Sequence, residues 1–261
     1  MPQFKSAACQ NEINKGDGEM KITFVGTSHG VPSANRFCSC YMIESGNGVY
    51  MVDAGAPAAD CIIRAGRDVN DFKALFTTHV HTDHTAGVLG LISVMNWHYK
   101  RSSGEFFFTS EAQVKAIEAW FAAAADPLKS DGRLRLRVAK TGEVYSDENI
   151  RVEYIPNQHM ANSYSILVSE GEKRVLFGGD FSNGLRSRDV PEVIGESIDL
   201  FICELAHFTA ADIAPYLEKC GAEAVAFTHV FPLEKYGDID KIKGLYPCKI
   251  ITPNDGDFVE I

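Results

Sequence analysis

One short segment of the sequence brings together side chains that bind metals. His79, His81, Asp83 and His84 place three imidazoles and a carboxylate within six residues. Neutral imidazole and carboxylate are the groups with which proteins hold zinc, iron and manganese. The alternative interpretation is that these are exposed loop residues without a function, but four such side chains at adjacent and alternating positions seldom occur by chance. The segment therefore predicts a metal site.

The elements on either side of this cluster indicate how it is positioned. Phe72–Thr77 is an apolar run of strand length, and Thr85–Leu91 has the composition of the start of a helix. Open α/β sheets place their ligands in the loops that follow the carboxyl ends of strands. We therefore expect the site at the carboxyl edge of a sheet.

Four more polar residues each end an apolar, strand-like run. They are Asp53, His159, Asp180 and His229. A single histidine at a strand end is usually structural, but four residues in this setting, added to the histidine cluster, predict one shared site.

Strand-like runs occur in both halves of the chain, and helical segments separate them. Strands are predicted at 21–26, 40–44, 49–53, 72–77, 105–109, 133–139, 150–155, 163–168, 174–177, 200–203, 224–227 and 249–252. Helices are predicted at 57–67, from 85 through 97, from a cap at Ser110, at 209–219 and at 239–245. This order predicts an α/β fold with two sheets packed face to face and helices outside, in one domain over residues 20–261. The polar residues 1–19 are predicted to be a flexible extension.

Composition narrows the class of protein. The 261 residues are 45% hydrophobic and 23% charged, which permits a sizeable core. The net charge of -10 disfavours a long nucleic-acid substrate, because an acidic surface repels phosphates. Seven scattered cysteines without Cys-x-x-Cys spacing are typical of reduced thiols in a cytoplasmic protein. No stretch is apolar enough to span a bilayer, so we expect no membrane partner.

Taken in order, these segments resemble the motifs of the metallo-β-lactamase superfamily over roughly residues 20–261. The resemblance implies a four-layer αββα sandwich with two divalent metal ions. One ion would take His79, His81 and His159, and the other Asp83, His84 and His229. Asp180 would bridge the two ions.

The implied ions would supply the chemistry. Zinc, manganese and iron all suit nitrogen and oxygen ligands, with zinc the first expectation. A pair of ions lowers the pKa of a bridging water toward neutrality and clamps the attacking and leaving oxygens. Asp83 would then serve catalysis as well as metal binding. Asp53 has two interpretations: it orients a ligand imidazole, or it stabilises the turn before Ala54–Gly55.

Within the superfamily, Gly26–Ser33 resembles the amino-terminal loop of the tRNase Z endonucleases and their phosphodiesterase relatives. His29 in this loop is a candidate for substrate binding. Those relatives carry a His-Glu-Ala-Thr segment, where this chain has Cys203 and Glu204, with His207 four residues after the cysteine. We interpret His207 as the general acid for the leaving group, oriented by Glu204. The alternative is a capping or surface histidine.

The segment between His159 and Asp180 bears on the substrate class. The segment Met160–Gly179 is too short for the tRNA-binding arm of those relatives, so RNA is a doubtful partner and a small phosphodiester, such as a cyclic nucleotide, is favoured. The alternative is hydrolysis of a lactone, a thioester or another small carbonyl or heterocumulene electrophile. Its apolar pocket would be lined by His29, Trp97, His98, Tyr99 and Phe208. A non-enzymatic metal-binding module is less expected. The relatives are often dimers, so a homodimer is one expectation.

Overall fold

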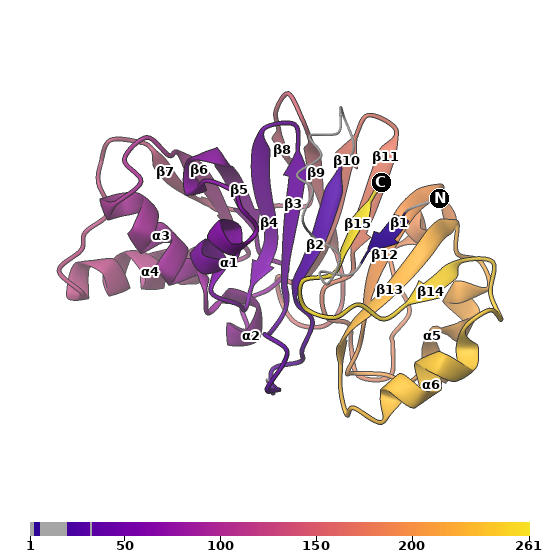
Figure 1. Ribbon diagram of the computed structural model, residues 1–261. Coiled ribbons are helices and arrows are strands. Elements are labelled where there is room, and N and C mark those ends of the chain that lie inside the picture. The colour runs from indigo at the N-terminus through magenta and orange to yellow at the C-terminus, as the bar shows by residue number, and fades with distance from the viewer. Residues whose placement is uncertain (1–2, 6–19, 32) are drawn as a thin grey trace.

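The computed structural model describes residues 3–5, 20–31 and 33–261, which form two β-sheets with helices on their outer faces (Figure 1). The eight-stranded sheet has the spatial order β1 (Gln3–Lys5), β15 (Phe258–Glu260), β2 (Lys21–Gly26), β3 (Cys40–Ser45), β4 (Gly48–Ala54), β5 (Phe72–Phe76), β6 (Gly104–Phe108) and β7 (Leu134–Val138). Strands from β1 to β4 pair antiparallel, and those from β4 to β7 pair parallel.

The second sheet repeats this mixed pairing. Its seven strands have the order β14 (Lys249–Ile251), β13 (Ala222–Val230), β12 (Ile198–Leu205), β11 (Lys173–Phe177), β10 (Tyr164–Glu170), β9 (Arg151–Pro156) and β8 (Gly142–Ser146). Parallel pairing joins β11, β12, β13 and β14, and antiparallel pairing joins the rest. Each sheet therefore contributes parallel strands whose carboxyl ends can share an edge.

Helices cover the outer face of each sheet. The first sheet carries α1 (Ala58–Arg64), α3 (Val88–Trp97) and α4 (Glu111–Ala123), with the single turn α2 (Thr82–Thr85) at its edge; the second carries α5 (Ala210–Leu217) and α6 (Lys235–Ile242). The part of the chain that the structure describes also contains the short 3-10 helices Val69–Asp71 and Glu192–Gly195. The predicted cap at Ser110 is confirmed, because its side chain accepts a hydrogen bond from the Gln113 amide at 3.2 Å.

Apolar side chains alternate along the strands and so build a core on each face of each sheet. On β5, Phe76 faces the core between the sheets, where it packs with Phe24 and Tyr154. Its neighbour Leu75 faces the opposite way, into the core beneath α1 and α3. A third core lies between the second sheet and its helices. The predicted α/β class and its four αββα layers are confirmed.

One predicted helix is divided. Residues 85–97 were expected to be continuous, but Gly87 separates α2 from α3. The Gly87 amide donates to the Ala54 carbonyl at 2.7 Å, and a Cβ on residue 87 would lie 1.8 Å from the Ala56 carbonyl oxygen. Only glycine allows the histidine loop to approach β4 this closely.

Three strands were not predicted. Both β1 and β15 have only three residues, and β8 is mostly polar, so none shows a clear alternating pattern. Strand β1 falls in the predicted flexible extension, yet it pairs antiparallel with β15. The rest of residues 1–19 lies outside the described residues.

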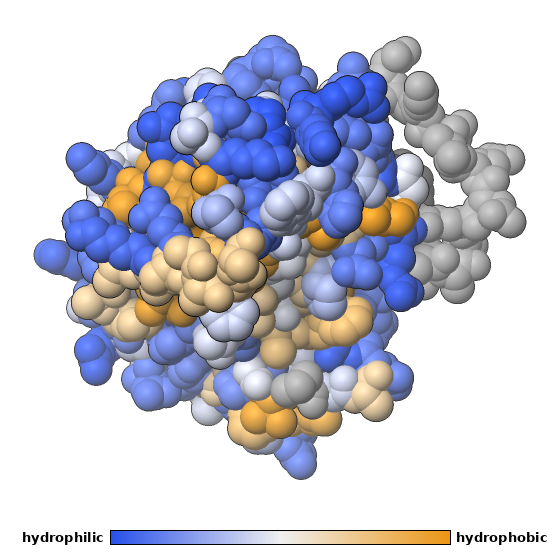
Figure 2. All heavy atoms as spheres, turned by 90° about the vertical axis from the view of Figure 1, so that its left-hand side faces the viewer, coloured by the Kyte–Doolittle hydropathy of each residue, from blue (hydrophilic) through white to orange (hydrophobic). Residues whose placement is uncertain are grey.

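The outer face over α3 and α4 is mainly hydrophilic, with apolar patches between the polar side chains (Figure 2). Among the described residues, no helix is long and apolar enough to cross a membrane.

Candidate metal centre

The seven predicted ligands converge, and two of them, Asp83 and His84, lie in α2. Six follow the carboxyl ends of β5, β9 and β11, and His229 is the penultimate residue of β13. They form two groups whose nitrogen and oxygen atoms lie within 4.8 Å of one another: His79, His81, His159 and Asp180; and Asp83, His84 and His229.

Asp180 lies between the two groups. One carboxylate oxygen, Oδ1, is 3.3 Å from His84 Nε2, while Oδ2 is 3.4 Å from His229 Nε2 and 3.8 Å from His79 Nε2. Burial opposes ionisation of Asp180, but the charges of His229 and His84 outweigh it and hold the pKa of this carboxyl well below its usual range. Asp180 is thus an anionic group placed to serve both clusters.

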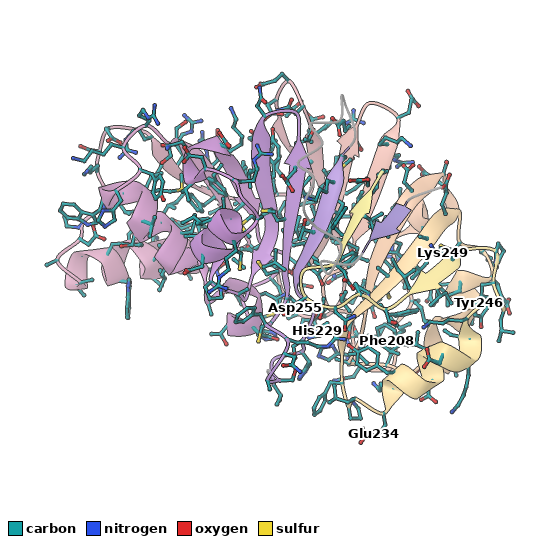
Figure 3. The ribbon with its side chains drawn as sticks, in the orientation of Figure 1. Phe208, His229, Glu234, Tyr246, Lys249 and Asp255 are labelled. Atoms are coloured by element: carbon teal, nitrogen blue, oxygen red, sulfur yellow. The ribbon has the colours of Figure 1, made fainter. Side chains whose placement is uncertain are left out.

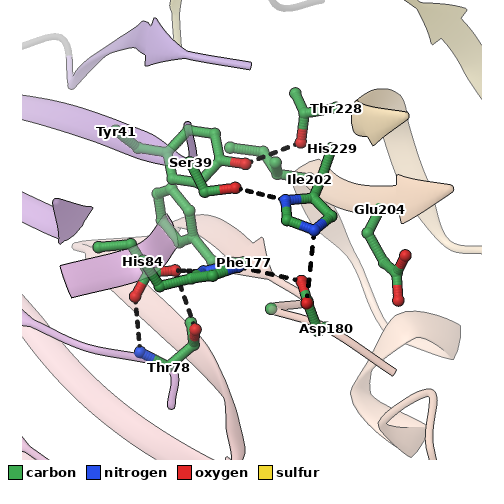
Figure 4. Close-up of a pocket in the computed structure, with 13 residues that line it drawn as sticks. Ser39, Tyr41, Thr78, His84, Phe177, Asp180, Ile202, Glu204, Thr228 and His229 are labelled. Carbon is green, nitrogen blue, oxygen red and sulfur yellow. Dashed lines mark hydrogen bonds and ion pairs between the residues drawn. The ribbon is translucent and has the colours of Figure 1, made fainter. Parts of the chain in front are cut away.

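Four of the imidazoles are oriented through their Nδ1 atoms, and Figure 4 shows one of them, His229, with its partner Ser39. The pairs are His79 with Thr78 Oγ1 at 3.0 Å, His84 with Asp53 Oδ2 at 2.7 Å, His159 with the Phe181 carbonyl at 3.0 Å, and His229 with Ser39 Oγ at 2.8 Å. Partners of this kind fix the tautomer and the ring orientation of a ligating histidine. Each Nε2 is thereby left for the centre.

The donor set fits a divalent cation. Three buried atoms of this donor set have no hydrogen-bond partner among the described residues: His84 Nε2, Asp180 Oδ1 and His229 Nε2. The ring nitrogen His81 Nδ1 also faces His79 Nε2 at 3.0 Å and His159 Nε2 at 3.4 Å. Buried polar atoms without partners are unfavourable, and imidazoles converging through their free nitrogens are the usual ligands of zinc, iron or manganese.

Two of the residues at the centre have an unusual backbone. Asp53 and His229 have φ values of 54° and 50°, a left-handed conformation that is uncommon without glycine. Each is the extra residue of a β-bulge, since the strand register skips Asp53 opposite Cys40–Tyr41 and skips His229 opposite Glu204–Leu205. Bulges redirect side chains, and here both point into the site.

The carboxylate of Asp53 connects two parts of the histidine loop. It accepts hydrogen bonds from the Thr78 amide at 2.7 Å and the Thr78 hydroxyl at 2.9 Å, besides its contact with His84. The hydrogen bond with His84 is the contact expected if Asp53 orients a ligand imidazole.

His207 reaches the same site from the loop after β12. Its Nδ1 lies 2.8 Å from Glu204 Oε1, and its ring centroid is 4.9 Å from that of His159. Burial lowers the pKa of His207, but the hydrogen bond with Glu204 and the charges of Glu204 and Asp180 outweigh it and raise the pKa. Cys203 cannot take this place, because its side chain is buried in the core beneath α5.

His29 lies at the mouth of the site. Its ring stacks on Phe231 with centroids 4.7 Å apart and lies 4.9 Å from the ring of His229. The next residue, Gly30, passes so close to Asp83 that a Cβ would lie 2.9 Å from its Oδ2. Burial lowers the pKa of His29, so its ring is neutral near pH 7.

Comparison with known families identifies the family of this chain. The model of the family described as anti-Pycsar protein Apyc1 matches residues 20–208. The chain belongs to this family. A ribonuclease Z of Nitrosopumilus maritimus is 31% identical over 156 residues, which are 59% of this chain and 50% of that protein. The chain spans about half the length of the first ribonucleases Z that it matches.

Solved structures share the fold of this Apyc1-family chain. The metallo-β-lactamase fold protein YhfI from Bacillus subtilis has a TM-score of 0.74 at 18% identity, covering 93% of this chain and 100% of that one. Human tRNase Z, short form, has a TM-score of 0.70 at 17% identity, covering 91% and 98%. The fold is therefore that of the metallo-β-lactamases.

The apolar pocket expected for a carbonyl substrate is not formed by the residues predicted for it. Phe208 is buried in the core of the second sheet. Tyr99 packs against the core of the first sheet, and Trp97 ends α3 beneath Lys129, whose Nζ lies 5.2 Å from its ring centroid. These three aromatic residues pack within the cores or against the surface of the fold.

Several residues that contact the candidate ligands or their loops were not predicted. They are Ser39, Thr78, Asn157, Asp189, Phe231 and Lys235. Asp189, for example, accepts hydrogen bonds from the Gln158 and Ser182 amides and so joins the His159 loop to the Asp180 loop. Thr78, Asn157 and Phe231 each lie within two residues of a predicted ligand, whereas Ser39, Asp189 and Lys235 come from segments that carry no ligand motif.

Proposed function

We propose that this chain is a metal-dependent hydrolase that binds two divalent ions and cleaves small phosphodiesters. The observation that carries the proposal is the convergence of seven candidate ligand side chains, three of which have a buried atom with no hydrogen-bond partner among the described residues. The relatives named ribonuclease Z support it, because a ribonuclease acts on phosphodiester bonds.

The ligands divide around Asp180, as its distances to His84, His229 and His79 indicate. When bound, the two ions would activate a water molecule as nucleophile and neutralise charge on the phosphate. The carboxylate of Asp180 is ionised in this setting, so it can hold both cations. Asp83 lies at the open side of the second group, where it is only partly buried.

His207 is placed to protonate the leaving oxygen. Its Nδ1 faces Glu204 Oε1, so the proton there is held and Nε2 is free to donate to substrate. Glu204 is itself held by the amides of Phe181, Ala206 and His207 at 2.8, 2.7 and 3.0 Å. Its carboxylate is therefore better placed to orient His207 than to bind a metal ion.

The substrate is proposed to be small. Between His159 and Asp180 the chain forms only the hairpin of β10 and β11, so no arm projects there to hold a long RNA. The net charge of -10 adds repulsion toward an extended phosphate backbone. A compact ester, such as a cyclic nucleotide, needs no arm to hold it and carries no extended phosphate backbone.

A substrate panel tests the proposal. Purified protein loaded with zinc or manganese is assayed on a cyclic nucleotide, a generic phosphodiester, a lactone, a thioester and a precursor tRNA. We expect turnover of the two small phosphodiesters and its loss after chelation. Faster cleavage of the precursor tRNA would replace the small substrate with RNA. Turnover confined to the lactone or thioester would replace phosphodiester cleavage altogether.

A further inference from the structure

The side chain of Lys235 holds the loop that carries His207. Its Nζ donates hydrogen bonds to the Ala206 carbonyl at 2.7 Å and to the Phe208 carbonyl at 2.7 Å. Lys235 is the first residue of α6, next to Glu234, and Figure 3 shows Glu234 and Phe208 at the same end of the molecule as His229. The ammonium group therefore bridges the carbonyls of the two residues that flank His207.

The rest of this loop is fixed just as fully. The His207 carbonyl accepts from the Gly184 amide at 3.0 Å. The amides of Ala206 and His207 donate to Glu204 Oε2. Three successive carbonyls and two successive amides are thus occupied, and the imidazole is left to face the site.

Lys235 is the only side chain among the described residues that holds two of these carbonyls, and it comes from a different segment. Its backbone amide donates to the Pro232 carbonyl at 3.1 Å, just after the segment that carries His229. A single residue therefore joins the His229 segment to the His207 loop. Hydrogen bonds from a charged donor are stronger than neutral ones, so this contact can set the position of the loop.

We propose that Lys235 is a positioning residue, which holds His207 where its Nε2 can reach the leaving oxygen of the substrate. This inference rests on the proposed phosphodiesterase function and on the role of His207 in it. A general acid works only within hydrogen-bond reach of the atom it protonates, so a small shift of the loop would remove most of its effect.

Two esters of different leaving groups distinguish positioning from general support of the fold. A nucleoside or alkyl ester leaves as an alkoxide and needs a proton, whereas a p-nitrophenyl ester leaves as a stable phenolate and does not. We expect Lys235→Met to lower kcat on the alkyl ester at least about tenfold and on the p-nitrophenyl ester less than about threefold. His207→Ala should give the same pattern, and Lys235→Arg should restore part of the lost rate.

The matched control is Lys241→Met on the same helix. Lys241 is 75% exposed and, among the described residues, pairs with Asp238 alone at 2.8 Å, so its loss should leave both rates unchanged. A readout independent of activity is amide hydrogen exchange in the metal-free protein. Exchange in the peptide covering residues 204–209 should be faster in Lys235→Met than in Lys241→Met, with metal content after loading unchanged.

Equal losses on the two esters in Lys235→Met, or no loss on either, would overturn the positioning role, and so would unchanged exchange in residues 204–209. Failure of the proposed function has a different signature, because the wild-type protein would then cleave neither ester.

Discussion

The hydrogen bond between Asp53 and His84 provides a sharp test of how the centre is organised. Asp53 is buried, and its carboxylate accepts from the Thr78 amide, the Thr78 hydroxyl and His84 Nδ1 at 2.7, 2.9 and 2.7 Å. In Asp53→Asn the side chain keeps its shape, but one oxygen becomes a donating NH2 group. If that group faces His84, Nδ1 must accept, and the ring proton moves to Nε2. That is the atom required by a metal ion.

The size of the effect follows from this tautomer. Loss of such a partner typically weakens metal binding by about 10- to 100-fold, which corresponds to about 1.4–2.8 kcal/mol. Because hydrogen bonds to a buried carboxylate are also lost, the metal-free protein should unfold with a free energy lower by about 1.5–3 kcal/mol. If Asp53 only stabilised its turn, the second effect would appear without the first.

The assay is a zinc titration of metal-free protein against a chromophoric chelator, with urea unfolding of the same samples. Asp147→Asn is the matched control. Asp147 is a half-buried carboxylate that accepts from Tyr50 and Tyr145 at 2.6 and 2.8 Å, in the turn between β8 and β9. It should lose stability while keeping wild-type zinc affinity. Wild-type zinc affinity in Asp53→Asn would refute the reasoning.

Three other outcomes are expected. Gly87→Ala should lower the zinc affinity and the free energy of unfolding, because its Cβ would lie 1.8 Å from a backbone oxygen. In the control Gly90→Ala, the new Cβ has open space in α3, so thermal unfolding should show no change or a stabilisation of up to about 1 kcal/mol. Asp180→Ala should abolish both metal occupancy, by elemental analysis, and turnover. In a pH–rate profile on an alkyl ester, the rate should fall as pH rises through the raised pKa of His207, because only the protonated ring donates. Glu204→Gln removes a contact that raises this pKa, so in that variant the rate should begin to fall at lower pH. An unshifted profile would argue against the pairing.

The sequence predicted the members of the site better than their support. Six of the seven ligand candidates follow apolar strands and His229 lies at the end of β13, and strand ends are visible in a pattern of residue types. The bulges at Asp53 and His229 cannot be recognised in the sequence, because neither residue is a glycine, the residue type that indicates a positive φ. Partners such as Ser39 and Lys235 are set by tertiary contacts and carry no local pattern.

The fold was predicted with similar limits. Long alternating or apolar runs, such as those of β5 and β13, identified strands correctly, whereas the three-residue β15 is too short to show a period. The break between α2 and α3 depends on the contact of Gly87 with β4, which is a property of the packed structure.

The most direct test of the proposed centre is the number of metal ions bound per chain. Purified protein, loaded with zinc and freed of excess metal, should contain about two ions per chain by elemental analysis, as expected for seven ligands in two groups. Turnover should disappear on chelation and return with metal. Protein that retains no ion after loading, with activity indifferent to chelators, would contradict the account.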